Sequence, residues 1–181
     1  MKAIQRIETK QNYHVIKADA LERITDSKYT FECLAILIAL DTGLRASDLL
    51  RLKASDISYN EETNSYQCKS YIKKTDTKDH IRPLSTDTYK AFKSIKFINN
   101  NLFFNPKTCK LFTRIWLTKR TTLRYGFSFH NIRKISAKRI LEVGTIADAQ
   151  LHLAHKRITS TNTYLKVSEK DSLERIRSLY R

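Results

Sequence analysis

The residues with the clearest chemical potential lie near the end of the chain, where a histidine is followed nine residues later by a tyrosine. These are His155 and Tyr164, and the stretch between them is rich in hydroxyl side chains. A tyrosine can attack an electrophile and form a covalent intermediate, and a nearby histidine can hydrogen-bond a phosphoryl oxygen or move a proton. The pair alone is a weak signal, because most tyrosines serve in packing. It predicts covalent chemistry only if other residues provide a phosphate site.

Two arginines are candidates for that site. Arg45 lies in the first turn of an expected helix that follows Gly43, and Asp48 lies three residues on, on the same face. A lone arginine here is most simply solvated, but its charge opposes the helix dipole and the chain turns inside the domain. Arg133 shares a helical face with Ala137 and Ile140, where an unpaired charge is costly. A phosphate fits its guanidinium fork, and the alternative is a structural pair with an acidic residue.

A hairpin lysine and a further histidine complete the set of candidates. Lys73 and Lys74 stand at the end of an expected strand, beside a turn. A lysine in that place usually guards a sheet edge, but on a tight hairpin it can also be presented to a phosphate. His130 precedes Arg133 by three residues. Taken alone, His130 is most simply a hydrogen-bonded core residue.

The composition favours a nucleic-acid partner. Among 181 residues, 34 are Lys or Arg and 18 are Asp or Glu, which gives a net charge of +16. A polyanion would offset this self-repulsion, with nucleic acid as the leading candidate and an acidic membrane surface as the second. The longest apolar run, 33–40, is too short to span a bilayer, and the polar N-terminus carries no secretory signal. Cys33, Cys68 and Cys109 fit no metal site, so we expect reduced thiols in a cytosolic protein.

The first third of the chain predicts helices that bring Arg45 into the domain. Residues 1–16 lack a clear period, so we expect a flexible or extended lead. Ser27 is a candidate cap for the apolar helix, and Gly43 is its candidate left-handed end. The expected helices are 17–24, 29–40 and 44–52.

Period-two alternation over residues 56–84 predicts a small antiparallel sheet. Tyr66, Cys68, Ser70 and Ile72 form its clearest alternating run. Turn signals at 60–64 and 75–79 separate three strands, of which the last is 80–84.

Helices dominate the second half of the chain as well. Ser85 begins the first with a capping signature, and Leu102 to Phe104 form a short buried segment. We expect a basic loop at 119–124 that suits a phosphate backbone. The expected helices are 85–98, 111–117, 129–144 and 146–154, and an amphipathic tail helix that docks on its own domain or on a neighbour. The candidate contacts to the DNA backbone are Lys119, Arg120, Arg124, Lys134, Lys138 and Arg139.

Taken together, these motifs resemble the catalytic domain of the tyrosine recombinases, the phage integrase family. The resemblance rests on Thr42-Gly43-Leu44-Arg45-Ala46-Ser47-Asp48-Leu49, on His130-Asn131-Ile132-Arg133, and on Leu153-Ala154-His155 with Tyr164 nine residues on. It runs from about Lys17 to the C-terminus. It implies a mainly α fold with a small three-stranded antiparallel sheet (α+β). The catalytic domain would then be 17–167, between the lead at 1–16 and a C-terminal helix at 168–181.

The resemblance also implies a role for each motif residue. Arg45 and Arg133 would clamp the non-bridging oxygens of the scissile phosphate, and Tyr164 would attack its phosphorus. The products would be a 3′-phosphotyrosyl link and a free 5′-hydroxyl, without metal, cofactor or ATP. The remaining roles would be a general acid for Lys74, a phosphate hydrogen bond for His155, help with proton movement for His130, and bracing of Arg45 or His130 for Asp48.

The resemblance further implies double-stranded DNA at specific sites as partner, in a cytoplasmic, nucleoid-associated protein of a prokaryotic or phage-infected cell. The tail helix would join protomers into dimers and tetramers on DNA. The chain departs from the family in three places. Ala154 replaces a usual glycine, and Lys73, Lys74 and Lys78 all lie near the hairpin. Arg45 also comes too early for the usual N-terminal DNA clamp, so the chain is either a catalytic-domain fragment or a short recombinase.

Two other functions fit the same motifs. A type IB topoisomerase shares the fold and the chemistry but relaxes supercoils as a monomer, and the tail helix favours the recombinase. A non-catalytic DNA-binding regulator is disfavoured by the intact candidate set, because each member could drift without catalysis.

Overall fold

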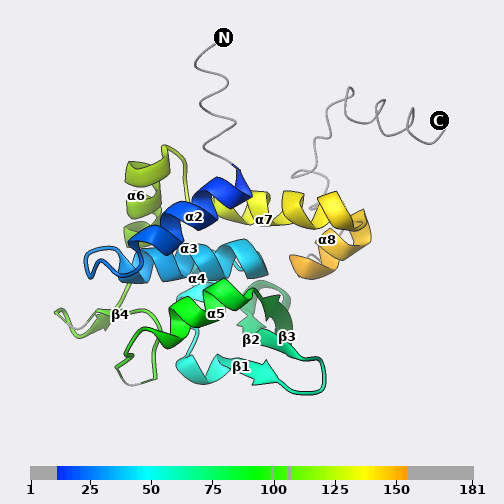
Figure 1. Ribbon diagram of the computed structural model, residues 1–181, viewed down its shortest axis with the longest axis horizontal. Helices are drawn as coiled ribbons and strands as arrows, with labels where there is room; N and C mark the ends of the chain where they lie inside the picture. Colours follow the sequence, from blue (N-terminus) through cyan, green and yellow to red (C-terminus); the bar gives the residue numbers. More distant parts are fainter. Residues whose placement is uncertain (1–11, 99, 106, 155–181) are drawn as a thin grey trace, which may run out of the picture.

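The buried helix α3, Thr30–Thr42, is the element around which the others pack (Figure 1). The structure is a computed structural model, and it describes residues 12–98, 100–105 and 107–154. All residues of α3 from Glu32 to Leu40 are buried, because apolar side chains surround its axis. Gly43 ends the helix with a φ of 62°, as predicted. The expected cap was wrong, since Tyr29 takes the N-cap position without a capping side chain.

The first described helix begins earlier than expected. Helix α2 runs over Tyr13–Arg23, and the Asn12 side chain caps it by accepting from the backbone N–H of His14 at 2.8 Å. Ile16 is fully buried against the core. The predicted lead was therefore wrong for residues 13–16, while residues 1–11 lie outside the described chain. The division into three segments stays a prediction.

The segment after Gly43 is less helical than predicted. Helix α4 covers only Ala46–Leu49, and Arg45 takes its N-cap position with an extended backbone. Leu49 and Leu52 are buried, as their spacing predicted. A short 3-10 helix, η1 at Ala54–Asp56, leads from there into the sheet.

The three-stranded antiparallel sheet is confirmed, with strand order β1-β2-β3. Its strands are β1 at Ile57–Asn60, β2 at Ser65–Ile72 and β3 at Thr77–Leu84. Cys68, Ser70 and Ile72 alternate toward the buried side of β2, as the period-two pattern predicted. The second turn is tighter than expected, because the 3-10 helix η2 at Lys73–Thr75 and a left-handed Asp76 complete it.

The segment after the sheet differs from the prediction in two elements. Helix α5, Thr86–Lys93, has the expected Ser85 cap but ends well before residue 98. Leu102 and Phe103 are fully buried, as expected, and a small unpredicted sheet follows. It pairs β4 at Phe104–Asn105 with β5 at Lys110–Leu111.

The expected basic loop at 119–124 was wrong, because these residues are helical. Helix α6 covers Arg114–Tyr125 and begins after a Thr113 cap. Its buried positions, Leu117, Thr121 and Tyr125, recur every four residues, but a threonine in the middle hides the apolar period from a sequence reading.

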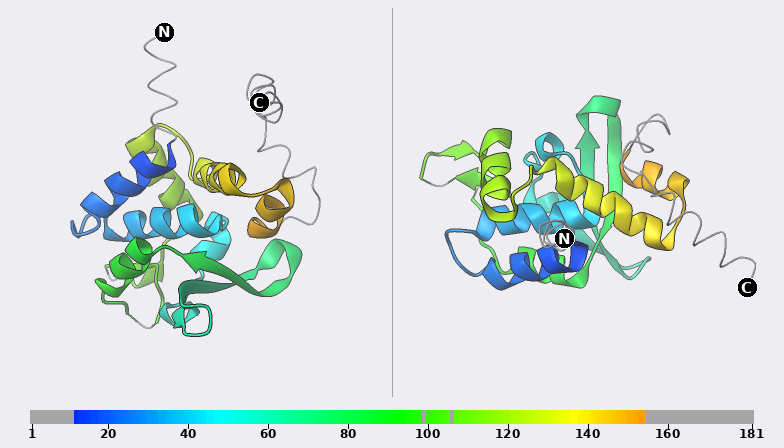
Figure 2. Two further views of the ribbon diagram at one scale, coloured as in Figure 1. Left: turned by 45° about the vertical axis from the view of Figure 1, so that its right-hand side comes forward. Right: turned by 90° about the horizontal axis from the view of Figure 1, so that it is seen from above.

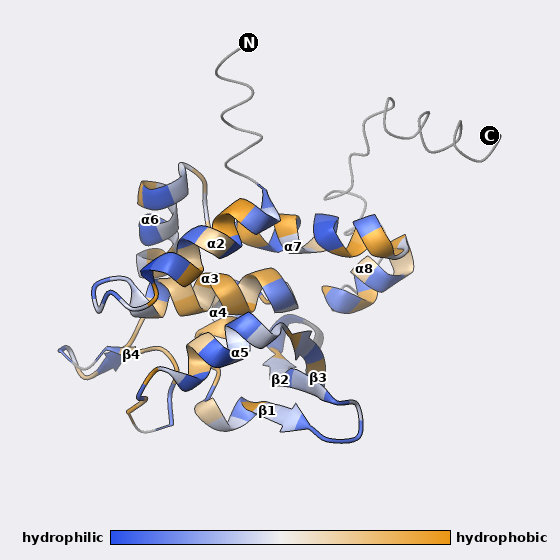
Figure 3. Ribbon diagram, viewed as in Figure 1, coloured by the Kyte–Doolittle hydropathy of each residue, from blue (hydrophilic) through white to orange (hydrophobic). Residues whose placement is uncertain are grey.

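The last described elements are α7, His130–Val143, and α8, Ile146–His152. Helix α7 packs across α3, and α8 turns back beside the β2–β3 hairpin (Figure 2). Gly144 ends α7 in an extended conformation, and Thr145 opens α8 with a capping box. Figure 3 shows how strongly apolar α3 is along its length. None of the helices in the described ranges is both long and apolar enough to cross a membrane.

Candidate active site

Arg45 lies where the central helix ends and the chain turns. Its carbonyl accepts from the backbone N–H of Asp48 at 3.0 Å and of Leu49 at 2.9 Å, so the first turn of α4 fixes its backbone. The Nη1 atom of Arg45 is buried and has no hydrogen-bond partner among the described residues. A buried donor without an acceptor costs free energy that a bound anion would recover. An anion bound beside Arg45 would provide the missing acceptor.

Arg133 joins two segments that are distant in the sequence. It is only 3% exposed. Its Nη1 atom donates to the Gly43 carbonyl, and its Nη2 atom donates to the Leu153 carbonyl at 2.6 Å. Because carbonyl oxygens orient the guanidinium without neutralising it, its positive charge is retained. The expectation that Arg133 is buried is confirmed, and its charge also acts to lower the pKa of Asp48, against the effect of burial.

Gly43 is also the point where α3 meets the end of α8. A Cβ atom at Gly43 would lie 2.8 Å from Leu153 Cδ2 and 3.1 Å from the His152 ring, so a side chain would push this contact apart. Ala154 then adopts a left-handed φ of 48°. This conformation favours glycine, which gives a physical reason for the glycine that the family usually carries at this position.

The hairpin that carries Lys74 is tied to the same region. Lys73 and Lys74 are both exposed in the η2 turn. The Asp48 carboxylate accepts a hydrogen bond from the Lys73 backbone, while burial raises the pKa of Asp48 and the charge of Arg45 opposes that rise. Asp48 thus links the start of α4 to the hairpin. The assignment of the general acid to Lys74 stays a prediction.

His130 lies at the start of α7, close to both arginines. Burial holds the pKa of His130 below its ordinary value, and the positive charges of Lys134, Arg133 and Arg45 lower it further. At neutral pH the imidazole is therefore uncharged, and a neutral imidazole can accept a proton.

A buried polar cluster behind the arginines was missed by the sequence reasoning. His80 and His152 are each 7% exposed, and the His80 ring hydrogen-bonds the backbone of His152. His152 Nε2 lies 2.9 Å from the Ser136 hydroxyl. Arg82 donates from Nε to the His152 carbonyl at 2.9 Å. The period-two pattern of β3 was the available signal. Residues 80 and 82 precede the buried Leu84 by four and two positions, so they share its face of the strand.

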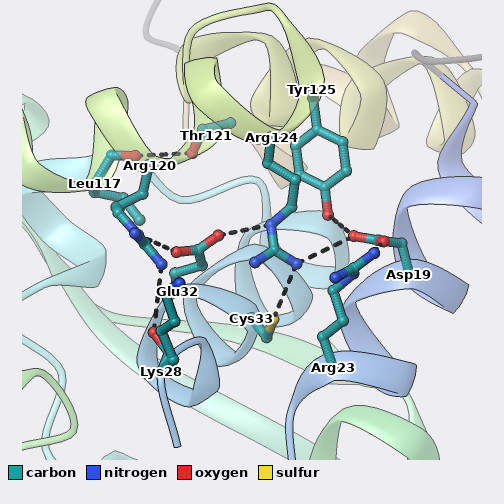
Figure 4. A network of polar contacts seen from close by, with 10 residues as sticks. All are labelled: Asp19, Arg23, Lys28, Glu32, Cys33, Leu117, Arg120, Thr121, Arg124 and Tyr125. Atoms are coloured by element: carbon teal, nitrogen blue, oxygen red, sulfur yellow. Dashed lines mark hydrogen bonds and ion pairs between the residues drawn. The ribbon is translucent and has the colours of Figure 1, made fainter. Parts of the chain in front are cut away.

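Two arginines of α6, Arg120 and Arg124, form ion pairs with acidic residues of α3 and α2 (Figure 4). Arg124 Nε lies 2.7 Å from Glu32 Oε1, and its Nη1 lies 3.4 Å from Asp19 Oδ2. Arg120 contacts the other oxygen of Glu32. Glu32 is only 2% exposed, so these pairs anchor α6 to α3. This gives Arg120 and Arg124 a structural role that the sequence reasoning missed, and their contact with DNA stays a prediction.

The remaining candidate residues include three lysines that the structure describes and residues beyond Ala154 that it does not. Lys119, Lys134 and Lys138 are exposed, as a contact with a phosphate backbone requires. His155, Tyr164 and the tail helix at 168–181 lie outside the described residues. Among the residues that the structure does describe, no group of three or more His, Cys, Asp or Glu side chains could hold a metal ion.

The charges of Arg45 and Arg133 both act on His130, and the carbonyl of Leu153, two residues before His155, is bound to Arg133. The model of the Phage integrase family matches residues 6–171, which covers most of the sequence. The chain belongs to the phage integrase family. A search of curated proteins gave no match.

Solved structures of tyrosine recombinases share the fold of this integrase-family chain. XerH site-specific recombinase bound to a palindromic difH substrate, in a post-cleavage complex, aligns with a TM-score of 0.71 and 18% identity, over 93% of this chain and 52% of that one. XerA recombinase aligns with a TM-score of 0.66 and 20% identity, over 92% and 63%. A lambda integrase(75-356) dimer bound to a COC′ core site gives 0.59 and 19%, over 84% and 58%. The chain thus spans between half and two thirds of these proteins.

Proposed function

We propose that this protein is a site-specific DNA recombinase that cuts and rejoins strands through a 3′-phosphotyrosyl intermediate at Tyr164. The observation that carries the proposal is the pair of arginines. Arg133 is held by the carbonyl of Gly43, which lies two residues before Arg45, and by the carbonyl of Leu153, which lies two residues before His155. Arg133 therefore connects its own motif on α7 to the motif that contains Arg45 and to the segment that leads to His155.

The arginine pair suits a phosphoryl-transfer transition state. Negative charge spreads over the non-bridging oxygens of the phosphorus as the nucleophile attacks, and two fixed guanidinium groups stabilise it more than they stabilise the ground state. The unpartnered Nη1 atom of Arg45 is available for one such oxygen. Because the donors are already oriented, little reorganisation accompanies the reaction.

Proton movements are assigned to two residues. Neutral His130 accepts the proton of the Tyr164 hydroxyl, directly or through another group of the site, as the phosphotyrosyl bond forms and the bond to the 5′-oxygen breaks. Lys74 gives a proton to the departing 5′-oxygen. The new ester retains the energy of the broken phosphodiester, so rejoining by the 5′-hydroxyl consumes no ATP.

DNA binding is supported by charge. The net charge of +16 attracts a polyanion, and the exposed Lys119, Lys134 and Lys138 are proposed contacts to its backbone. The solved relatives XerH and lambda integrase are bound to DNA sites.

The proposal is tested with a DNA substrate that carries a nick beside the cleavage position, so that the released piece diffuses away and the covalent adduct accumulates. The wild-type protein should yield an adduct that protease removes, and Tyr164→Phe should yield none. Tyr59→Phe changes an exposed tyrosine on β1 and serves as the matched control, with adduct formation as in wild type. An adduct of undiminished yield in Tyr164→Phe would refute the nucleophile assignment.

A further inference from the structure

The carboxyl end of α8 is capped by arginine side chains. A helix leaves its last carbonyl groups without partners inside the helix, and they are usually satisfied by a glycine-based cap, by water or by side chains. The Leu153 carbonyl accepts from Arg133 at 2.6 Å, and the His152 carbonyl accepts from Arg82 at 2.9 Å. The Leu151 carbonyl accepts from Arg82 and also from the backbone N–H of Ala154 at 3.1 Å. Three successive carbonyls at this helix end are therefore bound by two cations.

All three nitrogen atoms of the Arg82 guanidinium group donate to backbone carbonyls. Its Nε and Nη2 atoms reach α8, and its Nη1 atom donates to the carbonyl of Ile81 at 2.6 Å. Every nitrogen of the fork therefore has an acceptor, which fixes the plane of the group. Burial lowers the pKa of Arg82 to about 10, so it remains charged at neutral pH. A cation at the end of α8 also complements the helix dipole.

The contact connects two parts of the site that carry different chemistry. Arg82 lies on β3, the strand that follows the Lys74 turn, where it pairs with Cys68 of β2. Its acceptors belong to the last described turn before His155. Figure 2 shows α8 beside the hairpin in both views. Arg82 therefore connects β3, which follows the turn of the proposed general acid Lys74, to the end of α8, from which the chain continues toward Tyr164.

We infer that Arg82 is a positioning residue of the strand-cleavage reaction. It holds the carboxyl end of α8 against β3 and so fixes the point from which the chain continues to His155 and Tyr164. The inference rests on the proposed function. Arg82 does not contact the phosphate. It acts through α8, and a lysine cannot replace it because a single ammonium group does not reproduce the planar fork that spans two carbonyls.

The first test compares wild type, Arg82→Lys and the matched control Arg23→Lys, which changes an exposed arginine on α2 that holds Asp19 at 2.7 Å. In single-turnover reactions on the nicked substrate, Arg82→Lys should form adduct about 10- to 100-fold more slowly, because small misplacement of reacting groups is costly. The dissociation constant for DNA should stay within about threefold of wild type, since cleavage geometry and not binding is affected. Arg23→Lys should match wild type in both.

Two further readouts separate positioning from a general loss of stability. Amide hydrogen exchange in α8 should become about tenfold faster in Arg82→Lys, while α3 keeps its protection. A substrate with sulfur in place of the leaving 5′-oxygen needs no proton donor, so it should restore cleavage to Lys74→Met but not to Arg82→Lys. Arg82→Gln, which can donate to one carbonyl, replaces Arg82→Lys in all assays if the lysine variant does not fold.

The possible outcomes are distinct. Wild-type cleavage by Arg82→Lys, unchanged exchange in α8, or full rescue by the sulfur substrate would each overturn the positioning role. If wild type and Tyr164→Phe alike give no adduct, the proposed function fails, and the exchange experiment still shows whether Arg82 holds α8. If wild type cleaves and Arg82→Lys cleaves equally fast, only the positioning role fails.

Discussion

The two site arginines differ in what their side chains contact. Arg133 holds the Gly43 and Leu153 carbonyls and still carries its charge, whereas Arg45 keeps a buried nitrogen without a partner among the described residues. The two arginines therefore differ in role. Arg133 joins the chain at Gly43 to the end of α8, whereas in the proposed mechanism the unpartnered Nη1 atom of Arg45 would bind a phosphate oxygen. Removing Arg133 should for this reason disturb the fold more than removing Arg45.

The identity of the general acid is a prediction at the scale of one residue. Lys73 and Lys74 are both exposed in the η2 turn. Lys74→Met should slow adduct formation on normal DNA by about 100-fold, within the usual range for general acid catalysis, and should approach the wild-type rate on the sulfur substrate. Lys73→Met is the neighbouring control and should behave as wild type on both. The opposite pattern would assign the acid to Lys73, and no effect in either would exclude both.

The left-handed backbone at Ala154 leads to a stability prediction. Its φ is 48°, a conformation that an alanine adopts at a cost and a glycine adopts freely. Ala154→Gly should raise the free energy of unfolding by about 0.5–1 kcal/mol, measured by urea denaturation. Ala147→Gly, at an exposed position inside α8, should instead lower it by about 1 kcal/mol. A loss of stability in Ala154→Gly would show that its backbone is unstrained.

At the scale of elements, two buried histidines lie where β3, α7 and α8 meet. Burial lowers the pKa of His80 to about 4 and that of His152 to about 3, and the charge of Arg82 adds to both effects. Arg133 acts on both rings in the same direction, and Arg45 acts on His80. Protonation of either imidazole would place a new charge against these cations. Protonation of either ring should therefore weaken the contacts between β3, α7 and α8.

The sign of the pH dependence follows directly. Both histidines bind protons more readily in the unfolded chain, whose histidine pKa is about 6.5, so their contribution to stability is complete above that pH. It should be lost as the pH falls from about 6.5 toward about 4, with a slope of about 1.4 kcal/mol per pH unit for each histidine. Urea denaturation at a series of pH values measures this loss.

The control for the pH experiment removes one titrating group together with its partner. The double variant Ser136→Ala with His152→Leu replaces the 2.9 Å hydrogen bond by apolar contact, so no buried polar atom loses its partner. Its stability should depend on pH about half as steeply over the same window. Equal slopes in wild type and variant would mean that His152 is not the buried neutral group described above.

For the whole molecule, strong periods were predictable and long-range contacts were not. The continuous apolar run of α3, the alternation in β2 and the helical spacing in α7 each predicted the element correctly. Burial on all sides, or on one face, leaves such patterns of apolar side chains in the sequence. Helix α6 was predicted only in part, as a helix at 111–117, because Thr121 occupies its central buried position and hides the apolar period beyond residue 117. The contacts of Arg82 were missed because its acceptors are backbone carbonyls 69 and 70 residues away. Every residue type carries a backbone carbonyl, so the sequence does not indicate which one accepts.

Assembly is a prediction at the scale of the whole molecule, and it concerns residues beyond Ala154. The tail carries Leu173, Ile176 and Leu179 on one stripe, which we expect to dock on a neighbouring protomer. Sedimentation on DNA sites should show dimers and tetramers, and deletion of residues 165–181 should leave monomers on DNA. Wild-type monomers that relax supercoiled DNA would instead indicate a topoisomerase. Unchanged assembly after the deletion would place the contact elsewhere.

The central claim is that Tyr164 becomes joined to the 3′-phosphate of a cut strand, and mass spectrometry of the trapped adduct tests it most directly. Trypsin should release the peptide of residues 158–166, which contains a single tyrosine. The account predicts that this peptide carries a nucleotide through its 3′-phosphate at Tyr164, and that the other DNA end has a free 5′-hydroxyl. A link through a 5′-phosphate, or a link to any other residue, would contradict it.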